Sequence, residues 1–168
     1  TDRALNFHIW ARKASAAQTL STDLNAAGYS AIPVPDLNAA IGAADIITTT
    51  TTATKPLFAD GLVRKGSHVT AIGADCPGKQ ELPTKLVATA SLRVCDMASQ
   101  SLHHGEFQSA HRNDASLQVT ELGHILSGEQ IGRTSDEDIT VVDLTGIAAQ
   151  DIAITQTIID AAAGAKTQ

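Results

Sequence analysis

The chain has 168 residues, of which 43% are hydrophobic and 18% charged, and its net charge is −6 at pH 7. This length and balance are typical of a single globular domain with its own core and exclude an intrinsically disordered chain. The acidic balance argues against a nucleic-acid partner, and no apolar run reaches the roughly 18 residues that a membrane-spanning helix needs.

The first part of the chain alternates predicted strands with predicted helices. Asp36 is placed to cap the helix predicted from residue 37, and Gly28 is placed to end the helix predicted over 14–27. Residues 59–63 are expected to form one helical turn that ends at Gly66. Periodicity predicts strands over 5–10, 30–34 and 45–49, and helices over 14–27 and from residue 37.

The second part continues this alternation as far as a final helix that Gly164 is expected to end. The segments 97–104 and 106–113 are interpreted as helical pieces of a mostly polar surface. The other predicted elements are strands over 67–72, 92–95 and 139–144, and helices over 84–89, 117–126 and 147–164. Strands that alternate with helices indicate βαβ units, and therefore an α/β fold with a doubly wound, mostly parallel sheet.

The stretch SHVTAIGADCPGKQEL (67–82) is the first place to look for chemistry. Its apolar run is typical of a strand buried on both faces of a parallel sheet. Asp75 follows that strand, at the edge where open α/β sheets bind their ligands. Pro77 and Gly78 predict a tight turn that holds Lys79 close to Asp75. Asp75 could therefore be an acid–base residue beside a ligand, or it could hydrogen-bond its own backbone in the turn.

Arg12 bears on the choice of cofactor. A dinucleotide-binding fold often has an acid after its second strand to hold the ribose 2′-hydroxyl, and Ala11 and Arg12 occupy that place here. A cation there suits a 2′-phosphate and favours NADP over NAD, whereas the alternative is a solvated charge at a helix start. The chain contains no GxGxxG loop. This either argues against a dinucleotide fold or means that the first strand lies upstream, and we expect the chain to be the carboxyl-terminal part of a longer protein.

Three further features of the sequence could bind a ligand, a metal ion or each other. DLTGIAAQD (143–151) combines small residues with a helix start, which suits a negatively charged ligand as well as ordinary strand-to-helix packing. The histidines at 103, 104 and 111 do not have the spacing of metal ligands, so we expect no metal site. Cys76 and Cys95 are too few for a disulfide framework, which favours a reducing, cytoplasmic environment.

Four stretches of the chain together resemble the ornithine cyclodeaminase/μ-crystallin family. They are ADIITTTT (44–51), IGADCPGKQEL (72–82), ELGHILSGEQIGRTSDED (121–138) and ITVVDLTGIAAQD (139–151). The resemblance covers nearly the whole chain and is weakest at 96–118. It implies that residues 1–146 are a Rossmann domain that binds NAD(P) and lacks its first strand and glycine loop. Residues 147–168 would form a helix that leads back to a substrate-binding and dimerisation domain outside this chain.

The resemblance also implies roles for single residues. Asp75 matches the family's catalytic aspartate, and we expect burial to raise its pKa toward neutrality. Thr145 matches a position where the substrate binds. The matched cofactor positions are Thr51, Val69, Thr70, Ala71, Ile72, Lys79 and Leu144, and Arg12 joins them because of its place after the second strand.

The implied activity is a reaction at the Cα–N bond of an amino acid with NAD(P) as cofactor. An ornithine-cyclodeaminase-like enzyme oxidises the amino acid to an imine, releases ammonia and returns the hydride. A ketimine or cyclic-imine reductase, or an amino-acid dehydrogenase, carries out half of that cycle. A non-catalytic, crystallin-like binding protein is the alternative of another class. The implied partners are a small amino or imino acid and a second copy of the chain in a homodimer. No interaction with a membrane is expected.

Overall fold

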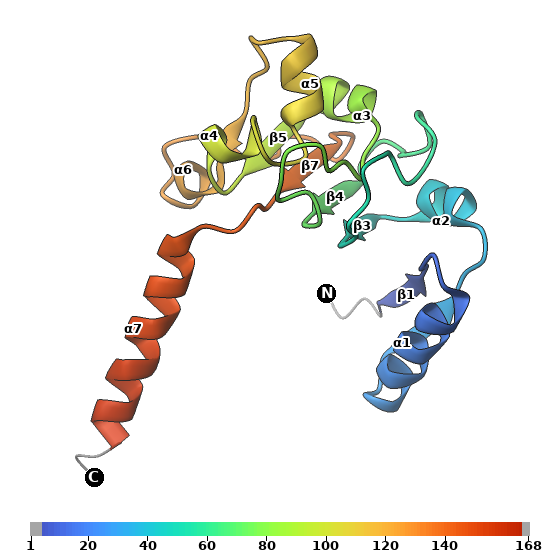
Figure 1. The fold of residues 1–168 in the computed structure, drawn as a ribbon, viewed down its shortest axis with the longest axis horizontal. Helices are drawn as coiled ribbons and strands as arrows, with labels where there is room; N and C mark the ends of the chain where they lie inside the picture. The colour runs from blue at the N-terminus through green and yellow to red at the C-terminus, as the bar shows by residue number, and fades with distance from the viewer. Residues whose placement is uncertain (1–4, 166–168) are drawn as a thin grey trace.

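The computed structural model describes residues 5–165, and its strands form two sheets (Figure 1). The smaller sheet pairs β1 (Asn6–Ile9) with β2 (Ser30–Pro33). The larger sheet has the order β3-β4-β7-β5-β6, with bounds Ile46–Thr49, His68–Ala71, Thr140–Asp143, Leu92–Cys95 and Thr120–Glu121. Every pairing in both sheets is parallel. The predicted α/β fold with a parallel, Rossmann-like sheet is therefore confirmed.

Helices connect the strands as the alternation predicted. Asp36 caps the second of them, since its Oδ1 accepts a hydrogen bond of 3.0 Å from the backbone N–H of Ala39. The helices are α1 (Ala14–Ala26), α2 (Leu37–Ala43), α3 (Thr84–Thr89), α4 (Ala98–Ser101), α5 (Gln108–Asn113), α6 (Leu122–Leu126) and α7 (Ala148–Ala165).

The hydrophobic core lies around the larger sheet. On β4 the side chains of Val69 and Ala71 are completely buried, and those of His68 and Thr70 are only partly exposed, as expected for an internal strand of a parallel sheet. The buried apolar cluster consists of Ile41, Ile47, Phe58, Val69, Ala71, Leu82, Leu86, Val87, Ala90, Cys95, Phe107, Ala110 and Val141. These aliphatic side chains fix β4 and its neighbours, and so fix the loops that leave their carboxyl ends.

Two predicted helical segments are wrong. Residues 59–63 form a turn, in which Gly61 takes the left-handed φ of +78° that interrupts a helix. The predicted helix over 117–126 begins only at Leu122, because Thr120 and Glu121 pair with the edge of β5 as β6. A free strand edge in the larger sheet thus overrides the helical spacing of the segment.

Two further expectations for the helices are corrected. The segment 97–113 is not a mostly polar surface, because Ser101, Glu106 and Gln108 are buried and hydrogen-bonded. Gly164 does not end the last helix, which continues to Ala165.

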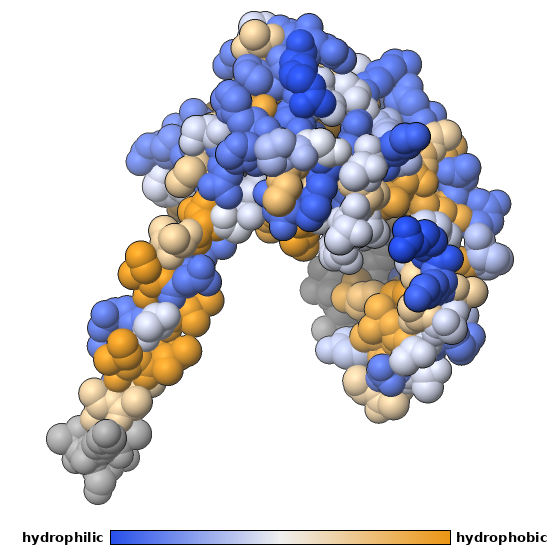
Figure 2. Space-filling view, viewed as in Figure 1, coloured by the Kyte–Doolittle hydropathy of each residue, from blue (hydrophilic) through white to orange (hydrophobic). Residues whose placement is uncertain are grey.

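The smaller sheet and α7 stand apart from the larger sheet (Figure 1). Among the described residues, no strand pairs with the outer side of β1 or β2, or with the outer side of β3 or β6, so both sheets have open edges. The side chains described on α7 are exposed, including a row of isoleucines that Figure 2 shows as apolar surface. The division into residues 1–146 and 147–168, with a further strand and domain outside them, stays a prediction. Over 5–165, no helix is both long and apolar enough to cross a bilayer.

Candidate functional site

The ends of three neighbouring strands meet at the carboxyl edge of the larger sheet. The backbone N–H of Ile72, after β4, donates to the carbonyl of Thr49 at the end of β3 over 2.9 Å. The N–H of Leu144, after β7, donates to the carbonyl of Ala71 over 3.0 Å. The residues that follow β3, β4 and β7 therefore lie side by side, at the edge where parallel sheets bind their ligands.

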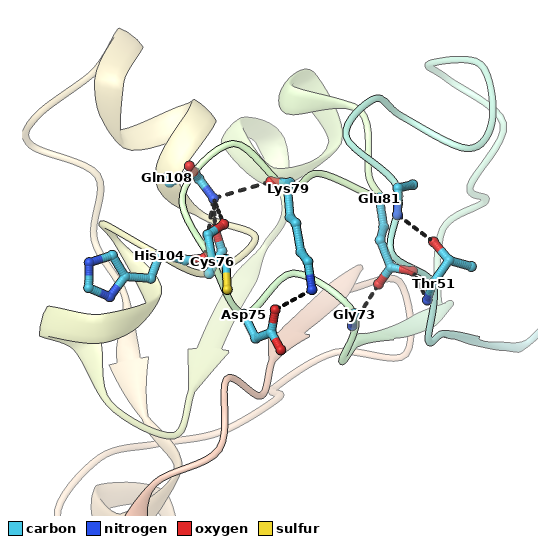
Figure 3. Close-up of polar contacts among 10 residues, drawn as sticks. Thr51, Gly73, Asp75, Cys76, Lys79, Glu81, His104 and Gln108 are labelled. Carbon is cyan, nitrogen blue, oxygen red and sulfur yellow. Dashed lines mark hydrogen bonds and ion pairs between the residues drawn. The ribbon is translucent and has the colours of Figure 1, made fainter.

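The loop after β4 brings Asp75 and Lys79 together, as its turn residues predicted (Figure 3). Gly78 has a φ of +84°, and the N–H of Lys79 donates to the carbonyl of Cys76 over 3.2 Å to close the turn. The ammonium of Lys79 then contacts Oδ1 of Asp75 at 2.5 Å. The structure thus favours an ion pair at this position, and the Asp75 carboxylate points to the ligand-binding edge with half of its surface exposed (51%).

The expectation of a raised pKa at Asp75 is wrong. The hydrogen bond from Lys79 lowers the pKa of this carboxyl below its ordinary value, and a hydrogen bond from Cys76 adds to the effect. The same contact raises the pKa of Lys79. Because the Asp75 side chain is half exposed, burial contributes too little to reverse this. Asp75 is therefore ionised at neutral pH, and its contact with Lys79 makes the carboxylate a weaker base than a free aspartate.

Glu81 holds the root of this loop, and sequence analysis did not single it out. Its buried carboxylate accepts hydrogen bonds from the N–H of Thr51 (2.5 Å) and the N–H of Gly73 (2.9 Å) (Figure 3). It also accepts one from the hydroxyl of Thr49 (2.7 Å). One side chain thereby joins the loops that follow β3 and β4. A Cβ on Gly73 would lie 2.0 Å from the carbonyl oxygen of Thr51, so only glycine fits where the two loops cross.

Gln108 holds the tip of the loop from the opposite side and was also missed. It belongs to α5 and is buried. Its Nε2 donates to the carbonyls of Lys79 (3.1 Å) and Cys76 (3.3 Å) (Figure 3). Its Oε1 accepts from the N–H of Gly78 over 2.9 Å. The turn that presents Lys79 to Asp75 is therefore fixed by a side chain about thirty residues away in sequence.

The structure brings most of the predicted cofactor positions to this edge but gives them different exposure. The side chains of Val69 and Ala71 are completely buried, so these residues can reach a ligand only through their backbone. Thr51 and Thr70 are partly exposed, and Ile72 presents an apolar side chain that is 44% exposed. Among the cofactor positions predicted in β4 and just after it, Ile72 therefore has the largest exposed apolar surface.

The predicted residues after β7 are anchored by an acid at the end of β5. Asp96 accepts hydrogen bonds from the hydroxyl of Thr145 (2.9 Å) and the N–H of Gly146 (2.7 Å). Leu144 and Thr145 are both partly exposed. Because Leu144 pairs with the end of β4, they lie at the same edge of the sheet as the loop of Asp75, and their roles stay a prediction.

Arg12 does not join the cluster around Asp75. It is exposed and follows β1 in the smaller sheet, just before α1. Its place after the carboxyl end of a parallel strand matches its expected position, and its role as a cofactor contact stays a prediction.

The histidines do not form a metal site. The rings of His103 and His111 make an edge-to-face contact with centroids 5.6 Å apart. Among residues 5–165 there is no group of three or more histidine, cysteine or acidic side chains placed to hold a metal ion.

Comparisons with known proteins bear on the fold and the family of this chain. A model of the ornithine cyclodeaminase/mu-crystallin family matches residues 4–166. The Delta(1)-pyrroline-2-carboxylate reductase of Bacillus cereus is 41% identical over 131 residues, which are 76% of this chain and 40% of that protein. An archaeal alanine dehydrogenase dimer with bound NAD has a TM-score of 0.89 at 31% identity, covering 99% of this chain and 52% of that one. The iminosuccinate reductase of Paracoccus denitrificans, in complex with NAD+, has a TM-score of 0.85 at 32% identity, covering 96% and 50%. The chain thus spans less than half of that curated relative and about half of the two solved chains.

Proposed function

Because this chain belongs to the ornithine cyclodeaminase/mu-crystallin family, we propose that the whole protein transfers hydride between a nicotinamide cofactor and the α-carbon of a small amino or imino acid. The observation that carries the proposal is the half-exposed carboxylate of Asp75. It is held by Lys79 beside the ends of β3, β4 and β7. A carboxylate at the ligand-binding edge of a parallel sheet can take up a proton beside a bound nicotinamide and return it in the reverse reaction.

The residues at this edge fit a nicotinamide dinucleotide. Ile72 offers exposed apolar surface to a flat ring, and the partly exposed hydroxyls of Thr51 and Thr70 lie on the neighbouring strand ends. The exposed guanidinium of Arg12 suits a phosphate and favours NADP. When bound, the cofactor supplies the carbon that takes up or gives the hydride.

The protein's own part in the reaction is the movement of a proton. The ionised Asp75 carboxylate can accept a proton at an Oδ atom from the substrate nitrogen or from a water beside it. The ammonium of Lys79 compensates the negative charge of Asp75 and keeps the carboxylate in one orientation. Thr145, whose hydroxyl is held by Asp96 at the same edge, is proposed to contact the substrate.

Three candidate functions differ in what becomes of the hydride. The relatives reported above are two imine reductases and an amino-acid dehydrogenase, which favours a reaction with net hydride transfer. The motif IGADCPGKQEL favours an ornithine cyclodeaminase, in which the hydride returns and ammonia leaves. A non-catalytic binding protein is the third candidate, and the retained acid at Asp75 argues against it.

The test uses the whole protein and measures ammonia and reduced cofactor in the same reaction. L-ornithine and L-alanine are supplied with NAD+ or NADP+, and cyclic and linear imino acids with NADH or NADPH. Ammonia without net reduced cofactor would identify a cyclodeaminase. Oxidation or reduction that matches substrate turnover would identify a dehydrogenase or an imine reductase. No turnover in any combination would contradict the proposal.

Asp75→Asn tests the role assigned to the carboxylate. The amide keeps the shape of the side chain but cannot accept the proton, so turnover is expected to fall by roughly a hundredfold or more. Binding of NADH, followed by its fluorescence, is expected to remain. Turnover close to that of the wild-type protein would remove Asp75 from the mechanism.

The remaining expectations are proposals for the whole protein. We infer a homodimer built through a domain outside residues 1–168, to which α7 leads with its exposed isoleucines. A cytoplasmic location is proposed because the two cysteines form no disulfide. Light scattering of the whole protein and fractionation of cells test these two proposals.

A further inference from the structure

Three buried acids, Asp143, Glu106 and Glu81, are linked one to the next by hydrogen bonds behind the candidate site. Asp143, at the end of β7, accepts a hydrogen bond of 2.9 Å from the backbone N–H of Glu106. The carboxylate of Glu106 accepts one of 2.9 Å from the N–H of Glu81. Each of these three side chains is at most 1% exposed. Each acid thus binds the backbone of the next, from β7 to the loop of Asp75.

The last acid of the chain binds the two loops that flank the site. Glu81 accepts from the N–H groups of Thr51 and Gly73, and Gly73 lies two residues before Asp75. A buried carboxylate that accepts several backbone hydrogen bonds fixes the backbone strongly, because each donor would otherwise be buried without a partner. The position of the Asp75 loop is therefore set from inside the protein.

Close-packed glycines mark both ends of this chain of acids. A Cβ on Gly105 would lie 2.1 Å from Oδ2 of Asp143, and a Cβ on Gly73 would lie 2.7 Å from Cδ of Glu81. Real side chains do not approach so closely, so the backbone at these points leaves no room for anything larger than glycine. The acids and the backbone are packed as one unit.

We propose that Glu81 is a positioning residue, and that the chain Asp143–Glu106–Glu81 holds Asp75 in its place at the carboxyl edge of the sheet. The activity part of this proposal rests on the proposed function, whereas the positioning itself does not. None of the three acids reaches the exposed edge, since all are buried. They therefore act through the loops and not by contact with a substrate.

The test replaces Glu81 with glutamine in the whole protein. The carboxylate offers two acceptor oxygens to three donors, but an amide has only one acceptor, and its NH₂ group would face an N–H donor. Glu81→Gln must therefore release Thr51 or Gly73. Asp138→Asn is the matched control, because Asp138 also accepts from two backbone N–H groups, those of Thr134 and Ser135, but lies before β7 and not after it.

Two readouts are needed. Amide hydrogen exchange reports directly on the N–H groups of Thr51 and Gly73, and in Glu81→Gln we expect at least one of them to exchange roughly a hundredfold faster. With an active substrate pair, kcat should fall at least about tenfold while the dissociation constant of NADH stays within about threefold. Asp138→Asn should leave both readouts at their wild-type values.

A second pair of variants covers the case in which Glu81→Gln does not fold. Thr49→Val removes one donor to Glu81 without changing the shape of the residue, and Thr49→Ser keeps the hydroxyl. The proposal requires both kcat and amide exchange at Gly73 to change in Thr49→Val and to return toward wild type in Thr49→Ser. An equal effect of the two substitutions would overturn it.

The outcomes separate this proposal from the proposed function. Wild-type protein without turnover on any substrate contradicts the function, and the exchange rates of Thr51 and Gly73 then decide the positioning role alone. Turnover with unchanged exchange and unchanged kcat in Glu81→Gln overturns the positioning role and leaves the function standing. Faster exchange with unchanged kcat, or the reverse, also overturns it, because positioning requires both to change.

Discussion

The larger sheet and the β1–α1–β2 unit are built from the same kinds of element but differ in how completely they are packed. The apolar core cluster is drawn from residues 41–141, around the larger sheet. In the β1–α1–β2 unit only Ala17, Ser21 and Ala31 are buried. Tyr29 and Ile32 have more than half of their surface exposed there.

This difference separates two ways in which a fold supports a site. In the larger sheet, buried acids and Gln108 tie the loops to one another, so the position of Asp75 depends on residues within the chain. In the β1–α1–β2 unit, Arg12 stands on an exposed turn and the neighbouring surface is open. Substitutions should therefore have large effects on folding in the first region and small ones in the second.

Gly73→Ala should give the largest loss of stability. A small loss would contradict the view that the larger sheet is the more tightly packed region. The new Cβ would meet the backbone oxygen of Thr51 at 2.0 Å and its nitrogen at 2.6 Å, and neither can move as a side chain can. We expect a loss of about 3 kcal/mol in the free energy of unfolding, measured by urea denaturation of the whole protein. Gly123→Ala is the control, because its Cβ would meet nothing within 4 Å and α6 favours alanine.

Asp143→Asn should change how stability depends on pH. Burial raises the pKa of Asp143 to about 7, whereas in an unfolded chain an aspartate titrates near about 4. Between these values the folded state binds more protons than the unfolded state, so stability falls as pH rises. Removing the acid should remove this part of the decline, on the order of 2 kcal/mol between pH 5 and pH 8.

Urea denaturation at several pH values measures this effect. Glu106 contributes a decline of the same sign, since burial raises its pKa to about 8, so the slope in Asp143→Asn should become smaller without vanishing. A wild-type stability that rises from pH 5 to pH 8 would contradict the assignment.

Arg12→Ala should act on cofactor binding and not on folding. If the guanidinium contacts a 2′-phosphate, the dissociation constant of NADPH should rise by roughly tenfold, and that of NADH should hardly change. The unfolding free energy should stay within about 0.5 kcal/mol of wild type. Fluorescence titration measures both affinities, and Lys13→Ala is the neighbouring control. Equal losses for the two cofactors would make Arg12 an ordinary surface charge.

Ile32→Thr should give the smallest effect. Its side chain in β2 is 52% exposed, and threonine keeps the β-branched shape, so the cost should be under about 0.5 kcal/mol. The same change at Ile47 in β3, which is 5% exposed, should cost about 2 kcal/mol. A cost at Ile32 similar to that at Ile47 would show that this surface is covered in the whole protein, and the contrast between the two regions would disappear.

Sequence analysis recovered what local patterns determine. All the strands except β6 and most helices follow from periodicity, and the contact of Lys79 with Asp75 follows from the turn residues Pro77 and Gly78. The segment 117–126 was wrong because the open edge of β5 is a tertiary feature that no local pattern shows.

The polar framework of the site could not be predicted in this way. Glu106 and Gln108 are polar residues of the kind that usually lie on the surface of a helix. They can be buried here because they bond N–H and carbonyl groups more than twenty residues away in sequence. The pKa of Asp75 was wrong for a related reason, since the exposure of its side chain depends on how the loop is held. The role of Glu81 became visible only in the structure, where its carboxylate accepts the hydrogen bond of the Gly73 N–H. Gly73 itself has no space for a side chain.

The chain of acids also has a consequence for the order in which this protein matures. Its hydrogen bonds join residues 30, 25 and 37 positions apart, from Thr51 to Glu81, from Glu81 to Glu106 and from Glu106 to Asp143. A ribosome releases Asp75 long before it adds Asp143, and contacts between distant segments form late in folding. If the chain of acids positions Asp75, we expect the loop of Asp75 to become ordered only after β7 has entered the sheet, so that the candidate site forms late in folding.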